Sequence, residues 1–452
     1  MRDLLRQLAP YLEAEVAAFV VEAGVPGAAA AAIVREEPTW ASACGVADAE
    51  TRAGLTASTP MRVGSLTKPF TAAAVLGLRD AGALSLDDPV TAHLAEFAAV
   101  RPFGGGRVDE VLVRHLVTHR AGLPGEARAL DEASDVYPTI DEILDGLAQV
   151  RLRSAPGAAM RYSNLGYQLL GEIVARRAGS TYERYCREAL LERLDLRLTS
   201  FHRPPDGARG HRAHAFTDHV RPVADRRKRT NADGGLWSTA LDQARWIRAN
   251  LEAEPSLPFL SEMQATLPGS DDDGSPGQGI GWFRERRATR TLLYHQGSTP
   301  GFAARAAFSP SLGAGAVVLA NGEASTIELI GRILDLVLDG VEGALPSEPA
   351  PPVPEPPLVV AHPAAWDELL GYYAWPGSSM LFRLEVRSGV LRLVDLDADK
   401  PVVLLADGDD RFVAADGGWA GEEVTIRRDG GGIVRGLRLG PWSVTRLVEA
   451  AP

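Results

Sequence analysis

Apolar residues recur at helical spacing in some stretches of the chain and alternate more tightly in others. The first stretch runs amphipathically from the amino terminus to about Val21 and predicts a helix. The Gly24-Val-Pro-Gly turn follows, and the runs after it predict strands over 27–34 and 40–46. The same patterns predict helices over 139–151, 165–178, 181–193 and 324–340, and consecutive antiparallel strands over 290–296, 302–309 and 314–320.

The pattern changes near the carboxyl end. Residues 346–357 are rich in proline, so this segment is expected to be extended and semi-rigid and to mark a domain boundary. Short alternating runs separated by Gly and Asp turns then continue from about 366 to 449 and predict a small antiparallel barrel or sandwich. We therefore expect an α/β (α+β) domain over 1–343, a linker over 344–362 and a β-barrel domain over 363–452.

A helix is predicted to begin close to Ser65. Pro69 lacks an N–H and fits only a first turn, and an apolar run continues at helical spacing to Gly82, which predicts the stop. Ser65 and Lys68 are three residues apart and therefore lie side by side on this helix. The serine hydroxyl then faces an amine, and its own N–H lies at the positive end of the helix. This arrangement suits an acyl-transfer nucleophile, although Ser-x-x-Lys alone also fits an ordinary helix start.

Composition narrows the class of protein. With 452 residues, 45% of them hydrophobic and 23% charged, the chain is expected to be soluble and globular with about two domains. A net charge of −12 argues against binding to nucleic acid or to an anionic membrane. No segment reaches the roughly 20 apolar residues of a membrane span, and the amino terminus lacks the apolar core of a secretion signal. A cytoplasmic protein with two free thiols, Cys44 and Cys186, is therefore predicted.

Three further stretches carry residues capable of chemistry. In Arg161-Tyr-Ser-Asn164, the asparagine is predicted to be the N-cap of the helix over 165–178, and the tyrosine two residues earlier projects the same way. In Tyr294-His-Gln-Gly-Ser298, the glycine marks a close approach to the strand backbone. Asp233-Gly-Gly235 predicts a turn before a helix. Taken singly, each stretch also fits a purely structural role.

The order of these motifs is more specific than any one of them. Ser-x-x-Lys, Tyr-x-Asn and His-x-Gly follow one another with about 100 and then about 130 residues between them. Over roughly residues 10–340 the chain resembles the serine β-lactamase and penicillin-binding-protein superfamily, which carries these motifs. The resemblance extends to Leu116-Val-Thr-His-Arg-Ala-Gly-Leu-Pro124 and to Gly279-Ile-Gly-Trp282. It implies a β-lactamase-like catalytic domain with an antiparallel sheet and a helical subdomain.

The resemblance also implies a role for each motif residue. Ser65 would be the nucleophile that forms an acyl-enzyme, and Lys68 and Tyr162 would share one proton and act jointly as its base. Asn164 would orient the lysine and bind an amide carbonyl of the substrate. The N–H groups of Ser65 and Ser298 would form the oxyanion hole. No metal or cofactor is implied, and the substrate-binding residues expected beside this centre are Gly234, Gly235 and Gly297.

His295 stands where β-lactamases and transpeptidases usually carry lysine. A histidine is mostly neutral at pH 7, so carboxylate recognition at this motif is weakened. His-x-Gly with an appended barrel resembles instead the D-stereospecific aminopeptidases, the β-lactamase-like esterases and the penicillin-binding-protein-type thioesterases with a C-terminal lipocalin-like domain. The specific expectation is a thioesterase that releases and cyclises a carrier-bound nonribosomal peptide, and the alternative is an aminopeptidase, amidase or esterase. The acyl donor, its chirality and the balance of hydrolysis and cyclisation stay open.

A cluster of basic residues and a single arginine bear on which substrate or protein partner binds. Arg226-Arg-Lys-Arg229 is either a solvated loop or a docking site for an acidic peptidyl carrier protein. Arg446, near the end of the last predicted strand, either faces solvent or reaches the cleft to bind the carbonyl end of a peptide.

Two other classes of protein fit the sequence less well. His115 and His119 are four residues apart like a zinc pair, but the segment lacks the glutamate of His-Glu-x-x-His. A non-catalytic binding protein on this scaffold would be expected to have lost Ser65, Lys68 or Tyr162, and all three are present. An acyl-transfer enzyme is therefore favoured over both.

Overall fold

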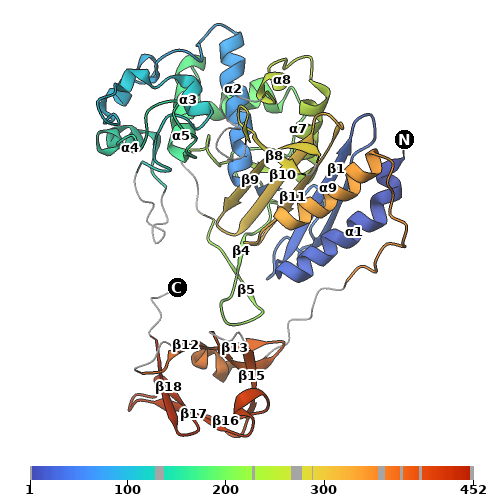
Figure 1. Ribbon diagram of the computed structural model, residues 1–452, viewed down its shortest axis with the longest axis vertical. Helices are drawn as coiled ribbons and strands as arrows, with labels where there is room; N and C mark the ends of the chain where they lie inside the picture. Colours follow the sequence, from blue (N-terminus) through green and yellow to red (C-terminus); the bar gives the residue numbers. More distant parts are fainter. Residues whose placement is uncertain are drawn as a thin grey trace. The chain divides into compact units, whose positions relative to one another are not determined.

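A computed structural model describes residues 3–127, 137–225, 230–265, 277–287, 289–354, 362–376, 380–396 and 400–447. The chain divides into two compact units, coloured along the sequence in Figure 1. The first unit contains residues 1–212 and 222–355, and the second contains residues 213–221 and 356–452. The sequence did not indicate that a short segment in the middle of the chain belongs to the carboxyl-terminal unit. The predicted boundaries at 343 and 363 stay predictions.

The first unit is built on an antiparallel sheet of seven strands. The predicted strands over 27–34 and 40–46 and the predicted antiparallel strands over 290–320 are confirmed. The two groups lie side by side because residues 28–34 of β1 (Gly27–Val34) pair with β11 (Ala314–Ala320). The strand β1 has the sequence GAAAAAIV, and every one of its residues is buried, as expected for a strand covered on both faces. The order across the sheet is β2 (Trp40–Gly45), β1 (Gly27–Val34), β11 (Ala314–Ala320), β10 (Phe302–Ser309), β9 (Arg290–Thr299), β8 (Phe283–Arg287) and β7 (Gly277–Gln278).

Helices cover both faces of this sheet (Figure 1). On one face, α1 (Leu4–Ala23) and α9 (Ile327–Val341) pack with the even-numbered residues of β1 in one apolar core. On the other face, the odd-numbered residues of β1 join the larger core. That core includes α2 (Thr67–Asp80), α3 (Val113–Val117), α4 (Ile140–Asp145), α5 (Asn164–Ala178), α6 (Tyr182–Cys186), α7 (Ala240–Glu252) and α8 (Leu260–Met263). None of the described helices combines the length and the apolar character that a membrane span requires.

Three helix predictions need correction. The predicted helix over 139–151 is a short α4 followed by a 3-10 turn, Gly146–Gln149, and the helix over 181–193 is α6 followed by a π turn, Arg187–Leu191. The N-cap of α5 is Ser163, because its hydroxyl accepts the Gly166 N–H at 3.0 Å. Asn164 is therefore the first residue inside the helix, and its amide is available to other groups.

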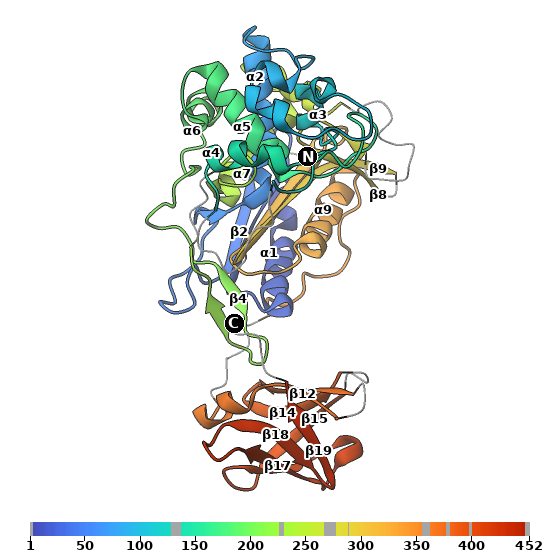
Figure 2. The same cartoon turned by 90° about the vertical axis from the view of Figure 1, so that its left-hand side faces the viewer.

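The second unit is a closed antiparallel barrel of eight strands, as the sequence predicts, shown from the side in Figure 2. Each strand pairs with the next, and the barrel closes where Tyr373 on the first strand lies opposite Arg446 on the last. The strands are β12 (Gly371–Ala374), β13 (Leu381–Arg387), β14 (Val390–Asp395), β15 (Lys400–Ala406), β16 (Arg411–Ala414), β17 (Glu423–Arg428), β18 (Val434–Leu439) and β19 (Trp442–Arg446).

The segment 213–221 is part of the barrel unit through specific contacts. Phe216 is buried in the barrel core, and its carbonyl oxygen accepts the Val386 N–H at 2.7 Å. The guanidinium of Arg387 donates to the carbonyl oxygens of Ala215 and Thr217. The segment begins at the last residue of β4 (His211–Ala213) and ends inside β5 (Val220–Pro222), and these two strands pair with each other. The chain thus passes between the two units three times rather than once.

Candidate active site

Ser65 lies in a 3-10 turn between a short strand and a helix. The turn, Gly64–Leu66, follows β3 (Met61–Arg62) and leads directly into α2, which ends at Asp80 just before Gly82. The predicted helix start and stop are thus confirmed. The serine is half-buried and borders a cavity of about 170 Å³. The cavity wall includes Asn164, Gly234, Ser298 and Glu126.

Two glycines allow β9 to approach this turn closely. A Cβ on Gly297 would lie 1.9 Å from the Val63 carbonyl oxygen and 3.1 Å from the Ser65 nitrogen. A Cβ on Gly64, which has a φ of +52°, would lie 2.9 Å from the Ser298 nitrogen. The backbones of Ser65 and Ser298 therefore approach each other closely, and both residues line the cavity. The role of Gly297 shown by the structure is this close backbone approach.

Lys68 is fully buried and bonded to three acceptors. Its Nζ donates to Ser65 Oγ at 3.0 Å, to Asn164 Oδ1 at 2.7 Å and to the Asp233 carbonyl oxygen at 2.6 Å. The first contact follows from the i, i+3 spacing on the helix start. The other two come from α5 and from the loop before β6 (Trp237–Ser238), so distant parts of the sequence fix the position of the amine.

Tyr162 also points at the serine. Its hydroxyl donates to Ser65 Oγ at 2.9 Å, and the Lys68 ammonium lies 4.8 Å from the centre of its ring. About 36% of the tyrosine remains exposed. Burial raises the pKa of Tyr162 well above its ordinary value, with the hydrogen bond to Ser65 opposing this shift in part. The phenol is therefore protonated at neutral pH.

His119 packs against the ring of Tyr162, a contact that the sequence did not indicate. Its ring packs on Tyr162 at 4.5 Å and on Tyr167 at 4.8 Å between centroids, and its Nδ1 accepts the Ser163 N–H at 3.1 Å. Burial and the nearby charge of Lys68 hold the pKa of His119 well below its ordinary range. The residue has a φ of +55°, which is uncommon for a side chain with a Cβ. The signal in the sequence was the segment 116–124, whose His119 was considered only as a zinc ligand.

His295 lies on β9 and is buried. Its Nδ1 donates to the Gln296 carbonyl oxygen at 2.8 Å, and its ring lies 6.3 Å from that of Tyr162 and 5.2 Å from that of Phe283 between centroids. Burial first, and then the charge of Lys68, lower the pKa of His295 to about 3. The side chain is therefore neutral at pH 7 and supplies no fixed positive charge.

Glu126 is a second residue that the sequence did not indicate. Its carboxylate lies in the wall of the cavity beside Ser65 and accepts the Asn164 amide N–H at 2.7 Å. Gln168, one turn further along α5, donates to the other carboxylate oxygen at 3.4 Å. A carboxylate thus holds the asparagine with its oxygen toward Lys68. No local pattern marked Glu126, because its loop carries no periodicity.

The remaining residues that were predicted to bind substrate differ in their surroundings. Gly234 lines the cavity, whereas Gly235 faces Asn231, whose Oδ1 would lie 2.2 Å from a Cβ there. Arg446 donates to the carbonyl oxygens of Glu368 and Leu370 within its own barrel, and its contact with substrate stays a prediction. The basic cluster 226–229 lies outside the described residues.

The two histidines considered as a zinc pair each accept a hydrogen bond from a backbone N–H group. Nδ1 of His115 accepts the Leu112 N–H at 3.1 Å, and Nδ1 of His119 accepts that of Ser163. In the part of the chain that the structure describes, no group of three or more His, Cys, Asp or Glu side chains is placed to hold a metal ion. The side chains that donate to Ser65 Oγ carry an amine and a phenol, which suit acyl transfer.

Comparisons with known proteins agree with this geometry. The family model "Beta-lactamase" matches residues 12–336, and a model for a domain of unknown function (DUF7586) matches residues 362–446. Protein flp of Staphylococcus aureus (strain NCTC 8325 / PS 47) is 24% identical over 312 residues, which cover 66% of this chain and 60% of that protein. The chain thus spans less than two thirds of the length of this curated relative.

Two further similarities come from enzymes. The D-alanyl-D-alanine-carboxypeptidase/endopeptidase AmpH of Escherichia coli (strain K12) is 25% identical over 275 residues, which cover 57% of this chain and 70% of that protein. The crystal structure of D-amino acid amidase from Ochrobactrum anthropi SV3, complexed with L-phenylalanine amide, has a TM-score of 0.63 and 26% identity, covering 74% of this chain and 99% of the amidase. Since the Beta-lactamase model matches well over half of the sequence, the chain belongs to the beta-lactamase family, within the serine hydrolases that resemble β-lactamases and penicillin-binding proteins.

Proposed function

We propose that this protein is a serine hydrolase that forms an acyl-enzyme on Ser65 and acts on amides or esters of small acyl donors. The observation that carries the proposal is the pair of hydrogen bonds at Ser65 Oγ, from Lys68 Nζ at 3.0 Å and from the Tyr162 hydroxyl at 2.9 Å. The lysine and the tyrosine, two side chains that can exchange protons, thus both contact the serine hydroxyl. A serine nucleophile needs such contacts to be activated.

The contacts favour a particular path for the proton. A neutral Lys68 would donate its two N–H bonds to Asn164 Oδ1 and the Asp233 carbonyl, leaving its lone pair to take the proton of Ser65. Ser65 Oγ then attacks the carbonyl carbon, and the N–H groups of Ser65 and Ser298 stabilise the oxyanion by about 3 kcal/mol per donor. Tyr162, protonated because its pKa is raised, donates to the leaving group and recovers a proton from Lys68. Water attacks the acyl-enzyme in the second half of the reaction, with the same groups moving the proton.

Glu126 bears on the class of acyl donor. Its carboxyl group lies in the cavity wall beside Asn164, so an acidic group borders the space that an acyl donor on Ser65 would occupy. A donor that carries a free amine next to its scissile carbonyl would place an ammonium group near this carboxylate. The similarity to an amidase of D-amino acids is consistent with such a donor. We therefore rank amino-acid amides and esters first among substrates.

The direct experiment offers D- and L-amino-acid p-nitroanilides and their N-acetyl derivatives to the protein. We expect turnover of the free-amine donors, an acyl adduct on the peptide containing Ser65 by mass spectrometry, and loss of both in S65A. E126Q should lower kcat/KM for free-amine donors about 10- to 100-fold, as expected for a lost charge-assisted hydrogen bond, and change that for N-acetyl donors much less. Full activity in S65A would refute the proposal, and equal effects of E126Q on both donors would refute the role of the amine.

A thioesterase that cyclises a peptide remains the second candidate. The features behind this expectation are the neutral His295 and the appended eight-stranded barrel. An acidic carrier protein as partner and a cytoplasmic location belong to the same hypothesis. Short peptide thioesters ending in D- or L-residues test it, because cyclic and linear products differ by the mass of one water. Cyclic product would favour this candidate, and only linear product would favour the hydrolase.

A further inference from the structure

We propose that His119 is a positioning residue that holds the Tyr162 hydroxyl against Ser65. This inference rests on the proposed function, since it concerns the phenol that moves a proton in the proposed reaction. Only 4% of His119 is exposed, so the residue would act through Tyr162 rather than on the acyl donor directly.

His119 binds the backbone on both sides of Tyr162. Its carbonyl oxygen accepts the Arg161 N–H at 2.7 Å, and its Nδ1 accepts the Ser163 N–H at 3.1 Å. The segment 161–163 therefore cannot shift relative to His119 without breaking one of these hydrogen bonds. Because Ser163 also caps α5 through its hydroxyl, the backbone that carries the tyrosine is held from two directions.

The imidazole ring also packs on the phenol ring itself. Its centroid lies 4.5 Å from that of Tyr162, with 31° between the planes, and 4.8 Å from that of Tyr167. Tyr167 is fully buried, and its hydroxyl donates to the Val117 carbonyl oxygen at 2.8 Å, so this second ring is fixed in place. The imidazole thus packs against a fixed ring and restricts the rotation of the Tyr162 side chain. This restriction keeps the phenol oxygen 2.9 Å from Ser65 Oγ.

The backbone at His119 has a conformation that usually belongs to glycine. His119 is the second residue after α3, and its N–H donates to the Leu116 carbonyl oxygen at 3.1 Å, while the Arg120 N–H donates to that of His115 at 2.7 Å. This is the Schellman pattern of a helix end, in which the left-handed residue is most often glycine. His119 occupies that place with a φ of +55°. A Cβ is costly in this conformation, and such strain clusters at active sites, where it fixes a reactive group.

The protonation state of His119 suits the same role. Nδ1 can accept the Ser163 N–H only while it carries no proton. Burial, together with the charge of Lys68, holds the pKa of His119 well below its ordinary range, so the ring is neutral at pH 7. The hydrogen bond to the backbone beside Tyr162 is therefore kept at the pH at which the enzyme would work.

The test removes the ring and the acceptor together and then restores the acceptor. H119G removes both, and glycine readily adopts a φ of +55°, so the end of α3 is kept. H119N restores an acceptor, because asparagine carries Oδ1 on the same Cγ that carries Nδ1 in histidine, and asparagine tolerates this backbone conformation. With an amino-acid p-nitroanilide as donor, kcat should fall about 10- to 100-fold in H119G and by less in H119N. KM should change little, because the loss is in the chemical step.

The deciding comparison repeats H119G in the Y162F background. If His119 acts through the phenol, H119G should change the kcat of Y162F by less than about twofold, because the hydroxyl that it positions is already absent. A residue that only supports the fold would lower kcat by the same factor in both backgrounds. Equal factors in the two backgrounds, or wild-type kcat in H119G, would overturn the inference while the proposed function stands.

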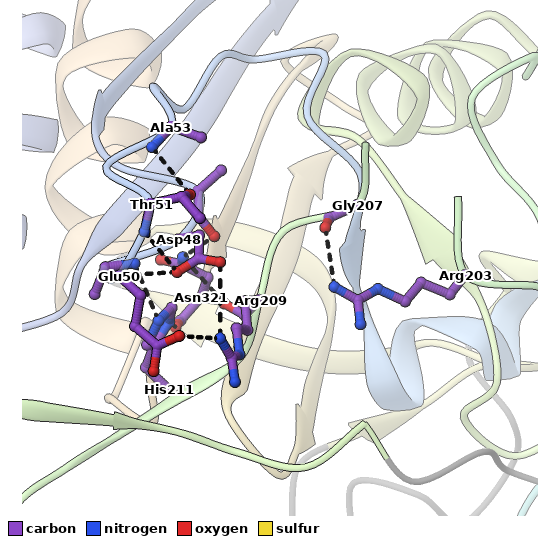
Figure 3. Close-up of polar contacts among 11 residues, drawn as sticks. Asp48, Glu50, Thr51, Ala53, Arg203, Gly207, Arg209, His211 and Asn321 are labelled. Atoms are coloured by element: carbon purple, nitrogen blue, oxygen red, sulfur yellow. Dashed lines mark hydrogen bonds and ion pairs between the residues drawn. The ribbon is translucent and has the colours of Figure 1, made fainter. Parts of the chain in front are cut away.

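His211 supplies the matched control for the loss of a buried histidine. It is fully buried, its Nε2 accepts the Ala49 N–H at 3.2 Å, and it lies among the polar contacts drawn in Figure 3. H211A should leave kcat unchanged.

A structural measurement separates this inference from the proposed function. If no donor is turned over, the proposed function fails, and crystal structures of the wild type and H119G decide the inference by themselves. A phenol oxygen more than about 3.5 Å from Ser65 Oγ in H119G, with the wild-type contact intact, would support the inference. A Tyr162–Ser65 hydrogen bond that H119G retains would overturn it.

Discussion

A Cβ on Gly297 would lie 1.9 Å from the carbonyl oxygen of Val63. The closeness of these two residues sets the position of Ser298 beside Ser65, because the backbone on either side of Gly297 cannot approach the serine turn unless the side chain is absent. The proposed oxyanion hole is therefore specified by a residue that supplies no catalytic group.

The first prediction concerns this approach. G297A should push β9 away from the serine turn and misplace one oxyanion donor, so kcat is expected to fall about 100- to 1,000-fold. Overpacking should also destabilise the fold by about 1–3 kcal/mol, which chemical denaturation measures. G54A is the matched control, since a Cβ there meets nothing within 4 Å. Near-normal kcat in G297A would mean that Ser298 is not an oxyanion donor.

The second prediction concerns Tyr162. Removing its hydroxyl in Y162F should lower kcat about 100- to 10,000-fold, the range expected for a general acid or base. Because burial raises the pKa of this phenol above its ordinary value of 10, the phenol stays protonated from pH 6 to 10. The pH–rate profile should therefore show no limb from Tyr162 within that range.

Y372F is the control for this substitution. Tyr372 is on the barrel strand β12, and its exposed fraction, 37%, matches the 36% of Tyr162. Removal of the Tyr372 hydroxyl in Y372F should leave kcat unchanged. Wild-type kcat in Y162F would exclude the phenol from the proton path.

The side chains around Ser65 were predictable from the sequence wherever the spacing of residues within one helix or extended stretch decides which side chains meet. Ser65 and Lys68 meet because they are three residues apart at a helix start. Tyr162 and Asn164 converge because they stand on either side of Ser163, whose backbone is extended. The strands over 27–46 and 290–320 were predictable because short apolar runs bounded by turns mark them.

Contacts made by tertiary structure alone were not predictable. Glu126 lies in an irregular loop, and only the folded chain brings its carboxylate to Asn164. Arg62, Arg203 and Arg209 come from separate segments and form one cavity only after folding. The cap of α5 was misassigned by one residue, because serine and asparagine are equally good caps and stand next to each other.

The third prediction is a pH dependence of stability. The pKa of His295 is lowered to about 3 in the folded protein, from about 6.5 when unfolded, so below pH 6.5 the unfolded chain binds a proton that the folded one does not. The free energy of unfolding should therefore fall as pH drops from 6.5 toward 3, by at most about 1.4 kcal/mol per pH unit from this residue. His119, with its pKa also lowered, should add to the slope.

Urea denaturation between pH 7 and 4.5 measures this effect. H295Q should show a shallower loss of stability over that range than the wild type, because its neutral side chain does not titrate. H202Q is the control, since His202 is exposed. An identical slope in H295Q and the wild type would mean that His295 is not held neutral by the fold.

The fourth prediction concerns the segment 213–221, which joins the barrel through Phe216. Truncating this side chain in F216A should leave a cavity in the barrel core and destabilise the barrel by about 3–5 kcal/mol. Hydrogen exchange of peptides from β13 and β14 in the full chain should accelerate at least 100-fold where exchange requires barrel opening. I433A is the control, because Ile433 is on the same unit but 55% exposed, and it should change exchange little. Unchanged exchange in F216A would mean that the barrel is stable without the segment, and the three chain passages between the units would then be a matter of connectivity rather than of folding.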